Sequence, residues 1–382
     1  MQPVCDGIAA FGTVTFVATT VAGASRSSPA VERRASPHLI RGAWYRVFVV
    51  ALVAAIFVSL CASVAIGPVS VPIGDVLRAL GHHIAPSAVA APHDAVFDQI
   101  VWELRAPRAL LALVVGGGLA VAGCVLQAVV RNPLADPYVL GAVSGASFGA
   151  VAVIVFGSAA VGGLGLPAAA FVGALASLAA VFALGRHAGM FSPTRLVLAG
   201  VALAYLFSAA TSYLQIHADD NELRAVVFWL LGSVADTEWN DLPVAAAVVF
   251  LVTGWLMLQT RPLNSLLIGD ESAYALGVDV SRFRAKLVIA SALMTGAVAV
   301  AGGIAFVGLM IPHVARLLAG PDHRRVIPVS CLLGASYLAF VDILSRTLEK
   351  PAELPLGILT AVIGAPFFLY LMHRSSRVVG GS

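Results

Sequence analysis

The chain has 382 residues, of which 59% are hydrophobic and 11% are charged. A soluble globular domain carries about 25% charged residues, so this composition excludes that class and indicates a membrane protein. The net charge of +3 gives no reason to expect a nucleic-acid partner, because the basic residues flank apolar segments.

Residues 1–42 form an extension rich in Ser, Thr and Ala. A secretory signal peptide has a positive region ahead of its apolar run, whereas Asp6 is the only charge in the corresponding first residues of this chain. We therefore predict a disordered cytoplasmic extension, in preference to a cleaved or additional span. A transmembrane domain over 43–376 and a short cytoplasmic tail over 377–382 follow from the hydropathy pattern.

Ten apolar segments predict an all-α polytopic membrane protein with about ten transmembrane helices. They lie at 43–66, 108–130, 139–156, 166–184, 193–216, 241–259, 283–302, 303–319, 326–347 and 355–373. The seventh and eighth segments run together through Gly302-Gly303, so nine helices is the alternative.

The distribution of Lys and Arg predicts the orientation. With the N-terminus inside, the inner loops and tails hold 17 of the 23 basic residues. Basic residues concentrate in cytoplasmic loops, so both termini of this multi-pass protein are expected in the cytoplasm.

An internal repeat is visible at an offset of 179 residues. Ala-Val-Ala-Gly occurs at 120–123 and 299–302, Pro133 matches Pro312, and Arg105 matches Arg284. The two helices would run in opposite senses, which predicts an inverted repeat relating helices 2–5 to helices 7–10. Small residues are common in apolar helices, so a chance match of the short motif stays open.

The common motifs of phosphate binding, zinc hydrolysis and thiol chemistry are absent. The sequence has no P-loop, HExxH or CxxC motif. His82, His83 and His93 are irregularly spaced, which favours solvated loop residues over a metal site. We therefore expect no catalytic residue, no metal site and no cofactor in this chain.

Asp342 is the only acid deep in an apolar segment, and Arg346 follows one helical turn later. Such a pair can satisfy itself at i,i+4. Runs of buried acids that would indicate an ion-coupled secondary transporter are missing, and so are the paired side chains of an intramembrane enzyme.

Five collinear stretches carry a resemblance to a known family. They are LRAPRALLALVVGGGLAVAGCVLQAVVRNPLADPYVLG (104–141), LVLAGVAL (196–203), LLIGDESAYALGV (266–278), AGGIAFVGLMIPHVARLLAGPDHR (301–324) and AELPLGILTAVIGAPFFLYL (352–371). Over about 41–376 the chain resembles the FecCD-like permease subunits of type II ABC importers, which take up ferric siderophores, cobalamin and haem.

The resemblance implies a permease in the bacterial inner membrane with several partners. These are a second permease copy (the same chain or a paralogue), two ATP-binding cassette subunits that bind ATP and Mg, and an extracytoplasmic substrate-binding protein that is periplasmic or lipid-anchored. A ferric siderophore is the expected substrate, with cobalamin or haem as alternatives. An ion-coupled secondary transporter is the alternative of another class.

The resemblance also implies roles for residues at the helix ends. Arg105, Arg108 and Arg346 would pair with acids of the binding protein, the alternative being that they anchor helices at the headgroups. The segment Gly269–Gly277 predicts a short helix begun by acids and ended by glycine, and in the family it couples to the ATPase. Its coupling residues are Gly269, Asp270, Glu271, Ala275, Leu276 and Gly277.

The inner gate and the pathway complete the implied set. The gate residues are Asn132, Pro133, Leu134, Pro193 and Thr194, although a small hydroxyl residue is usual at the position of Pro193 in the cobalamin relative. The polar residues that could line the pathway are Gln127, Ser144, Ser147, Thr211, Ser212 and Gln215. Hydrogen bonding between helices is an equal explanation of each of these polar residues.

Overall fold

A computed structural model describes residues 42–92, 94–137, 141–187, 190–191, 193–350 and 352–379. The predicted N-terminal extension lies outside the described residues, except for Gly42. At the other end, α15 continues to Val379, past the predicted start of the tail at 377.

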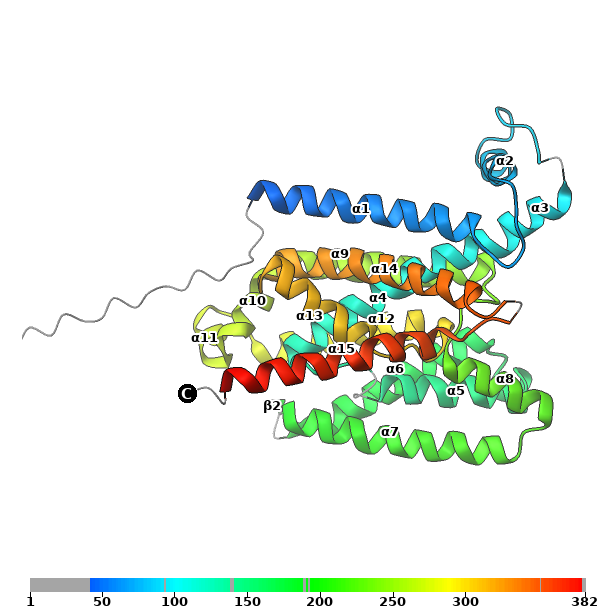
Figure 1. Ribbon diagram of the computed structural model, residues 1–382. Coiled ribbons are helices and arrows are strands. Elements are labelled where there is room, and N and C mark those ends of the chain that lie inside the picture. Colours follow the sequence, from blue (N-terminus) through cyan, green and yellow to red (C-terminus); the bar gives the residue numbers. More distant parts are fainter. Residues whose placement is uncertain are drawn as a thin grey trace, which may run out of the picture. The chain divides into compact units, whose positions relative to one another are not determined.

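The described chain is almost entirely helical (Figure 1). Its elements are α1 (Gly42–Ala65), α2 (Ile73–Ile84), α3 (Ala95–Gln99), the π-helical η1 (Ile100–Arg105), α4 (Ala106–Val130), α5 (Ala142–Phe156), η2 (Ala159–Val161), α6 (Leu166–Gly185), β1 (Arg186–His187), β2 (Met190–Phe191), α7 (Pro193–Ile216), α8 (Asp220–Leu231), η3 (Trp239–Asp241), α9 (Leu242–Leu258), α10 (Thr260–Ile268), α11 (Asp270–Ala275), α12 (Val280–Val298), η4 (Ala299–Ala301), α13 (Val307–Ala319), α14 (His323–Thr347) and α15 (Leu356–Val379). The two short strands pair antiparallel.

The ten predicted segments each correspond to one helix. Within the described residues, seven helices are long and apolar enough to cross a membrane, and three shorter apolar helices complete the set (142–156, 307–319 and 356–371). The alternative of nine helices is wrong. The chain leaves helical geometry between Val298 and Val307, with Gly302 at φ 71° and Phe306 at φ 68°.

The two ends of the helical bundle carry different elements. We call the inner end the one where α1 begins, α10 and α11 lie, and α15 ends; the outer end carries α2, α3 and α8 (Figure 1). The names follow the orientation predicted from the basic residues. That orientation itself stays a prediction.

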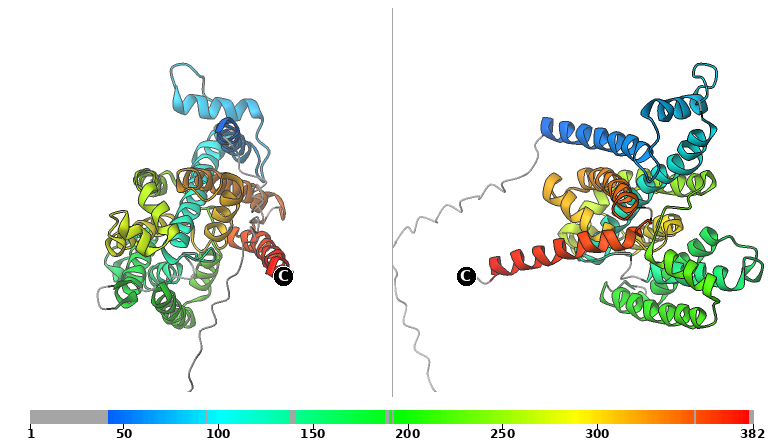
Figure 2. Two further views of the ribbon diagram at one scale, coloured as in Figure 1. Left: turned by 90° about the vertical axis from the view of Figure 1, so that its left-hand side faces the viewer. Right: turned by 45° about the vertical axis from the view of Figure 1, so that its right-hand side comes forward.

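Helix α4 forms the centre of the bundle (Figures 1 and 2). It is buried along nearly its whole length and packs against α14, α12, α13 and α9. Its small residues make this possible, because Gly116 lies against the backbone of Gly334 and Gly123 against the backbone of Gly308. In lipid, such close approach of helices replaces the hydrophobic drive that holds soluble bundles together.

Peripheral helices present apolar side chains outward. Phe57 of α1, Tyr205 of α7 and Phe250 of α9 are mostly exposed in the single chain. An apolar surface of this kind is suited to acyl chains or to another membrane subunit, so the arrangement agrees with a polytopic protein.

The sequence match at an offset of 179 residues falls on different local structures. Residues 120–123 lie inside α4, whereas 299–302 form the 3₁₀ turn η4 and its cap. Pro133 follows α4 in a turn, and Pro312 lies within α13. The inverted repeat therefore stays a prediction that these short matches do not strengthen.

The contact of α4 with α13 gives a test of the packing. A methyl group at Gly123 would overlap the carbonyl of Gly308, so we expect Gly123→Ala to lower the free energy of unfolding by roughly 1–3 kcal/mol. Thermal unfolding of the purified chain in detergent measures the change. The control is Gly254→Ala in α9, where a methyl group meets open space. Equal stability of the two variants would contradict this packing.

Candidate functional sites at the two ends of the bundle

A buried ion cluster joins three helices at the outer end. The carboxylate of Asp342 in α14 accepts a hydrogen bond from Nε of Arg108 in α4 at 2.8 Å and from Nη2 of Arg346 at 2.8 Å. The same Nη2 donates to Oγ of Ser63 in α1 at 2.7 Å. Arg108 also donates to Glu353, which precedes α15, at 2.7 Å. One fully buried carboxylate therefore holds two guanidinium groups.

Arg105 serves the end of α1 instead. Its Nη1 donates to the carbonyl oxygens of Val64 and Ala65 at 3.0 Å each, and Nη2 donates to that of Val69. The last carbonyls of a helix have no partner within the helix. Arg105 supplies that partner, and Gly67 leaves room for its guanidinium.

The three arginines predicted to dock a partner are thus committed inside the chain. Each is at most 6% exposed. Arg108 and Arg346 have carboxylate partners and Arg105 has carbonyl partners, as expected where an unpaired charge is costly. The predicted pairing of Asp342 with Arg346 is confirmed. The docking role stays a prediction, and Glu353 and Ser63 are members of the cluster that sequence reasoning missed.

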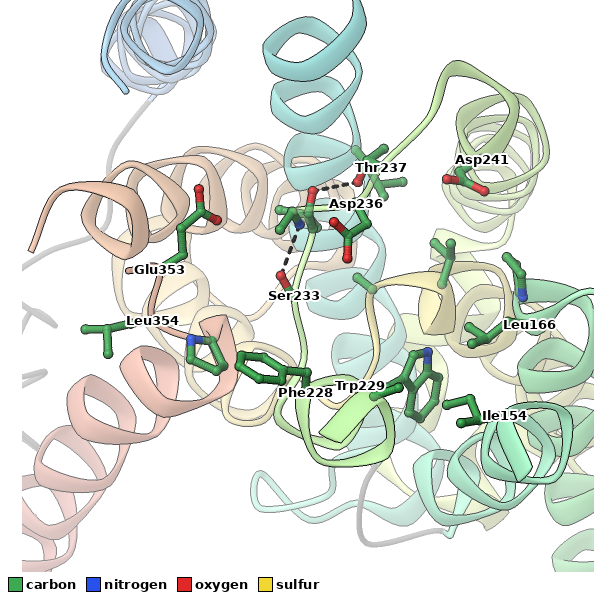
Figure 3. Close-up of a pocket in the computed structure, with 18 residues that line it drawn as sticks. Ile154, Leu166, Phe228, Trp229, Ser233, Asp236, Thr237, Asp241, Glu353 and Leu354 are labelled. Atoms are coloured by element: carbon green, nitrogen blue, oxygen red, sulfur yellow. Dashed lines mark hydrogen bonds between the residues drawn. The ribbon is translucent and has the colours of Figure 1, made fainter. Parts of the chain in front are cut away.

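A cavity of about 460 Å³ opens beside this cluster at the outer end (Figure 3). Its walls come from α8, the 233–241 loop, η4 and the segment before α15, and carry the carboxylates of Asp236, Asp241 and Glu353. The loop is held by its own hydrogen bonds, from Thr237 to the carbonyl of Val234 at 2.7 Å and from Ala235 N–H to Ser233 at 3.0 Å. No feature of the sequence predicted this cavity.

The outer-end histidines have specific partners. His83 bonds Asp98 at 3.1 Å and stacks on Trp102, which in turn packs against Trp239. His82 bonds the carbonyl of Val89. Both side chains are therefore ordered by local contacts, and His93 lies outside the described residues.

The predicted short helix at the inner end is present as α11. It begins at Asp270 and ends before Gly277, and the positive φ values of Gly269 and Gly277 permit the sharp turns on either side. Asp270 accepts hydrogen bonds from Arg284 of α12 at 2.9 and 3.1 Å and from Arg131 at 3.2 Å. Glu271, Ala275 and Leu276 lie on the same short segment.

Arg131 connects the predicted gate loop to the predicted coupling segment. It is the left-handed C-cap residue of α4, with φ 54°, and the next residues are Asn132 and Pro133. Asn132 shapes this loop by accepting a hydrogen bond from Leu134 N–H at 2.9 Å. An ion pair therefore links the gate loop to α11. Neither Arg131 nor Arg284 was among the predicted gate and coupling residues.

Helix α10 is tied to the start of α14 by a second polar contact. The amide of Asn264 donates to Asp322 at 2.6 Å, and its oxygen accepts from the N–H of His323 at 2.9 Å. Burial raises the pKa of Asp322, but the N–H of Arg324 and the amide of Asn264 outweigh burial and hold this pKa below its ordinary value. Asp322 is thereby kept ionised as the N-cap of α14.

The remaining predicted residues divide by exposure. Leu134 and Thr194 are exposed at the inner end, and Pro193 begins α7. Gln127, Ser147 and Thr211 are buried within the single chain, where Gln127 bonds carbonyls of α13 and Thr211 bonds Phe207. Hydrogen bonding inside the protein accounts for these contacts. Ser144 and Gln215 are half-buried and Ser212 is exposed, so their pathway role stays a prediction.

The outer cluster leads to a stability test. Asp342→Asn removes the carboxylate that Arg108 and Arg346 share and leaves two buried positive charges without it. We therefore expect the free energy of unfolding to fall by about 3–5 kcal/mol. The exposed acid Glu349 gives the control, since Glu349→Gln should have no measurable effect. The double variant Asp342→Asn/Arg346→Gln should unfold at a higher temperature than Asp342→Asn alone. Equal unfolding temperatures for these two variants would mean that the cluster is not electrostatically coupled.

Comparisons with known proteins agree with this architecture. The model of the FecCD transport family matches residues 52–374. An uncharacterized ABC transporter permease protein of Bacillus subtilis, YvrB, is 41% identical over 325 residues, which cover 84% of this chain and 91% of that protein. The cobalamin import system permease protein BtuC of Halobacterium salinarum is 42% identical over 292 residues, covering 76% of this chain and 77% of that protein.

A second named transporter and a solved structure are also similar. The hemin transport system permease protein HmuU of Yersinia pestis is 42% identical over 286 residues, covering 74% of this chain and 85% of that protein. The solved structure of a metal-chelate type ABC transporter in an inward-facing conformation aligns with a TM-score of 0.74 at 34% identity, covering 86% of this chain and all of the solved one. With ten apolar helices in the part of the chain that the structure describes and this match over most of its length, the chain belongs to the FecCD transport family and is a polytopic ABC transporter permease.

Proposed function

We propose that this chain is the membrane subunit of an ATP-driven importer and forms the pathway for a large iron chelate, a ferric siderophore in the first instance. The observation that carries the proposal is the ion link from the gate loop to α11 through Arg131 and Asp270, in a chain of this family. Relatives named for cobalamin and hemin transport keep those two substrates as alternatives.

The inner end offers a surface for an ATPase subunit. Four exposed apolar residues lie within ten positions of the sequence: Leu267 and Ile268 of α10, and Tyr274 and Leu276 of the α11 segment. Apolar side chains in a polar, inner-end loop favour burial against a protein partner. Two such ATPase subunits would bind ATP and Mg, and their movement would reach the gate loop through Asp270 and Arg131.

The pathway itself needs a second copy of the permease. The gate residues Leu134 and Thr194 are exposed in the single chain, so a facing copy, identical or paralogous, would complete a closure that one chain leaves open. The inner end would face the bacterial cytoplasm, with both termini there. Substrate would pass without covalent chemistry in this chain.

An extracytoplasmic binding protein would deliver the substrate at the outer end. Arg108 and Arg346 are buried, but Glu353 is partly exposed and holds Arg108 from the outside. An acidic side chain of the binding protein could replace Glu353 as the outer partner of Arg108. This exchange would reconcile the predicted docking role with the burial of the arginines.

The secondary-transporter alternative gains no support from the deep acid. Asp342 is engaged by two arginines, so its charge is already neutralised within the chain. A proton-carrying acid instead needs to gain and lose its charge at low cost during the cycle.

The proposed ATPase surface can be tested by replacing one exposed apolar residue. We expect Leu276→Asp to reduce co-purification of the ATPase at least tenfold, because it places a charge in an apolar contact. The matched control is Ile84→Asp at the outer end, a residue that is also mostly exposed and lies away from the proposed surface. Unchanged co-purification of the Leu276→Asp variant would show that the ATPase binds elsewhere.

Uptake by a deletion strain tests the substrate. Cells lacking this gene should lose uptake of radio-iron supplied as a ferric siderophore and keep uptake of labelled cobalamin and of haem, and the intact gene should restore the loss. If uptake of cobalamin or haem is lost instead, that compound is the substrate, and the proposed importer function still holds. Retention of all three uptakes would contradict the proposal.

A further inference from the structure

A cavity of about 270 Å³ lies at the inner end, where α4, α10, α13 and the start of α14 meet. Gln127, Arg131, Leu267, Arg316 and His323 contribute to its lining. None of the described residues that line it is acidic. The predicted gate loop forms one of its walls, so an occupant would touch both the gate loop and α10.

Arg316, in the last turn of α13, has no acidic partner among the described residues. The salt bridges at this end are otherwise made by Asp270, which holds Arg131 and Arg284, and by Asp279, which holds Arg282. The carbonyls at the end of α13 offset part of the charge, but a helix end provides only a fraction of a unit charge. A partly buried guanidinium in this setting calls for an anion.

We propose that this cavity binds one phosphate group. Arg316 and Arg131 bind the phosphate oxygens. Guanidinium groups are suited to phosphate because they present planar pairs of donors. The headgroup of phosphatidylglycerol and inorganic hydrogen phosphate share this chemistry, and basic pockets at the cytoplasmic ends of membrane helices take lipid headgroups.

The position of the site gives it a consequence for the gate. Arg131 belongs to the gate loop and already pairs with Asp270 of α11, whereas Arg316 and His323 belong to α13 and α14. A phosphate held between Arg131 and Arg316 would connect the loop to a second part of the bundle. Occupancy would therefore restrain the gate loop without contacting the substrate.

The test uses the full-length chain in lipid nanodiscs and needs no transport assay. One arm contains phosphatidylglycerol in phosphatidylcholine, and native mass spectrometry counts the lipids retained by the protein. The other arm contains phosphatidylcholine alone, and inorganic phosphate is titrated while thermal unfolding is recorded. We expect one bound phosphate species per chain in at least one arm, weakened at least tenfold by Arg316→Gln.

Two further variants make the result decisive. Arg282→Gln removes the same charge from an exposed site at the same end and should bind as the wild type does. Arg316→Lys keeps the charge but loses the planar donor pair, so it should bind at an intermediate level and serves if Arg316→Gln does not fold. Retained phosphatidylglycerol identifies a lipid site, and a phosphate-dependent rise in unfolding temperature identifies a free-anion site.

The proposal is overturned if the wild type and the variants at position 316 bind equally in both arms. It is also overturned if the wild type binds neither probe. In that case, loss of ATPase co-purification in the Arg316→Gln variant would show that a protein carboxylate occupies the cavity instead.

Discussion

The carboxylate of Asp342 holds the outer end of this protein together. It is fully buried, and it binds guanidinium groups from α4 and from its own helix while Ser63 of α1 completes the cluster. Neither arginine could stay at this depth without it, because unpaired charges are costly where water is absent. The outer ends of α1, α4 and α14 are consequently fixed to one another. A partner that docks at this end therefore meets arginines whose charges are already paired with carboxylates of the same chain.

Helix α4 connects this cluster to a second one at the inner end. Arg108 lies near its start and Arg131 caps its other end, about 35 Å away at 1.5 Å per residue. Arg131 pairs with Asp270, which also holds Arg284 of α12. Between the two clusters, glycine contacts with α13 and α14 keep the helix tightly enclosed. A buried helix with charged contacts at both ends is well placed to transmit displacement between the gate loop and the outer end.

Much of the architecture was predictable because hydropathy acts locally. A segment of about 20 apolar residues in lipid satisfies its own backbone only as a helix, so ten segments gave ten helices, including the three short ones. Helix α11 was predictable for the same reason, since the acids at its start and the glycine after it are local features. The burial of the arginines was not predictable, because Arg108 pairs with Asp342 and Glu353, which lie more than two hundred residues away in the sequence. The two cavities likewise form from segments that no sequence spacing relates.

The sequence by itself determined the membrane class, the number and approximate limits of the apolar helices and, through its motifs, the family resemblance that the comparisons confirm. Only the tertiary structure decided which polar side chains pair with each other. Arg105 caps α1, Arg108 and Arg346 share Asp342, and Arg131 joins the gate loop to α11, whereas Arg316 lines a cavity without an acidic partner among the described residues. The physical reason is that apolar length is a property of one segment. The pairing of a buried charge depends on which helices pack together.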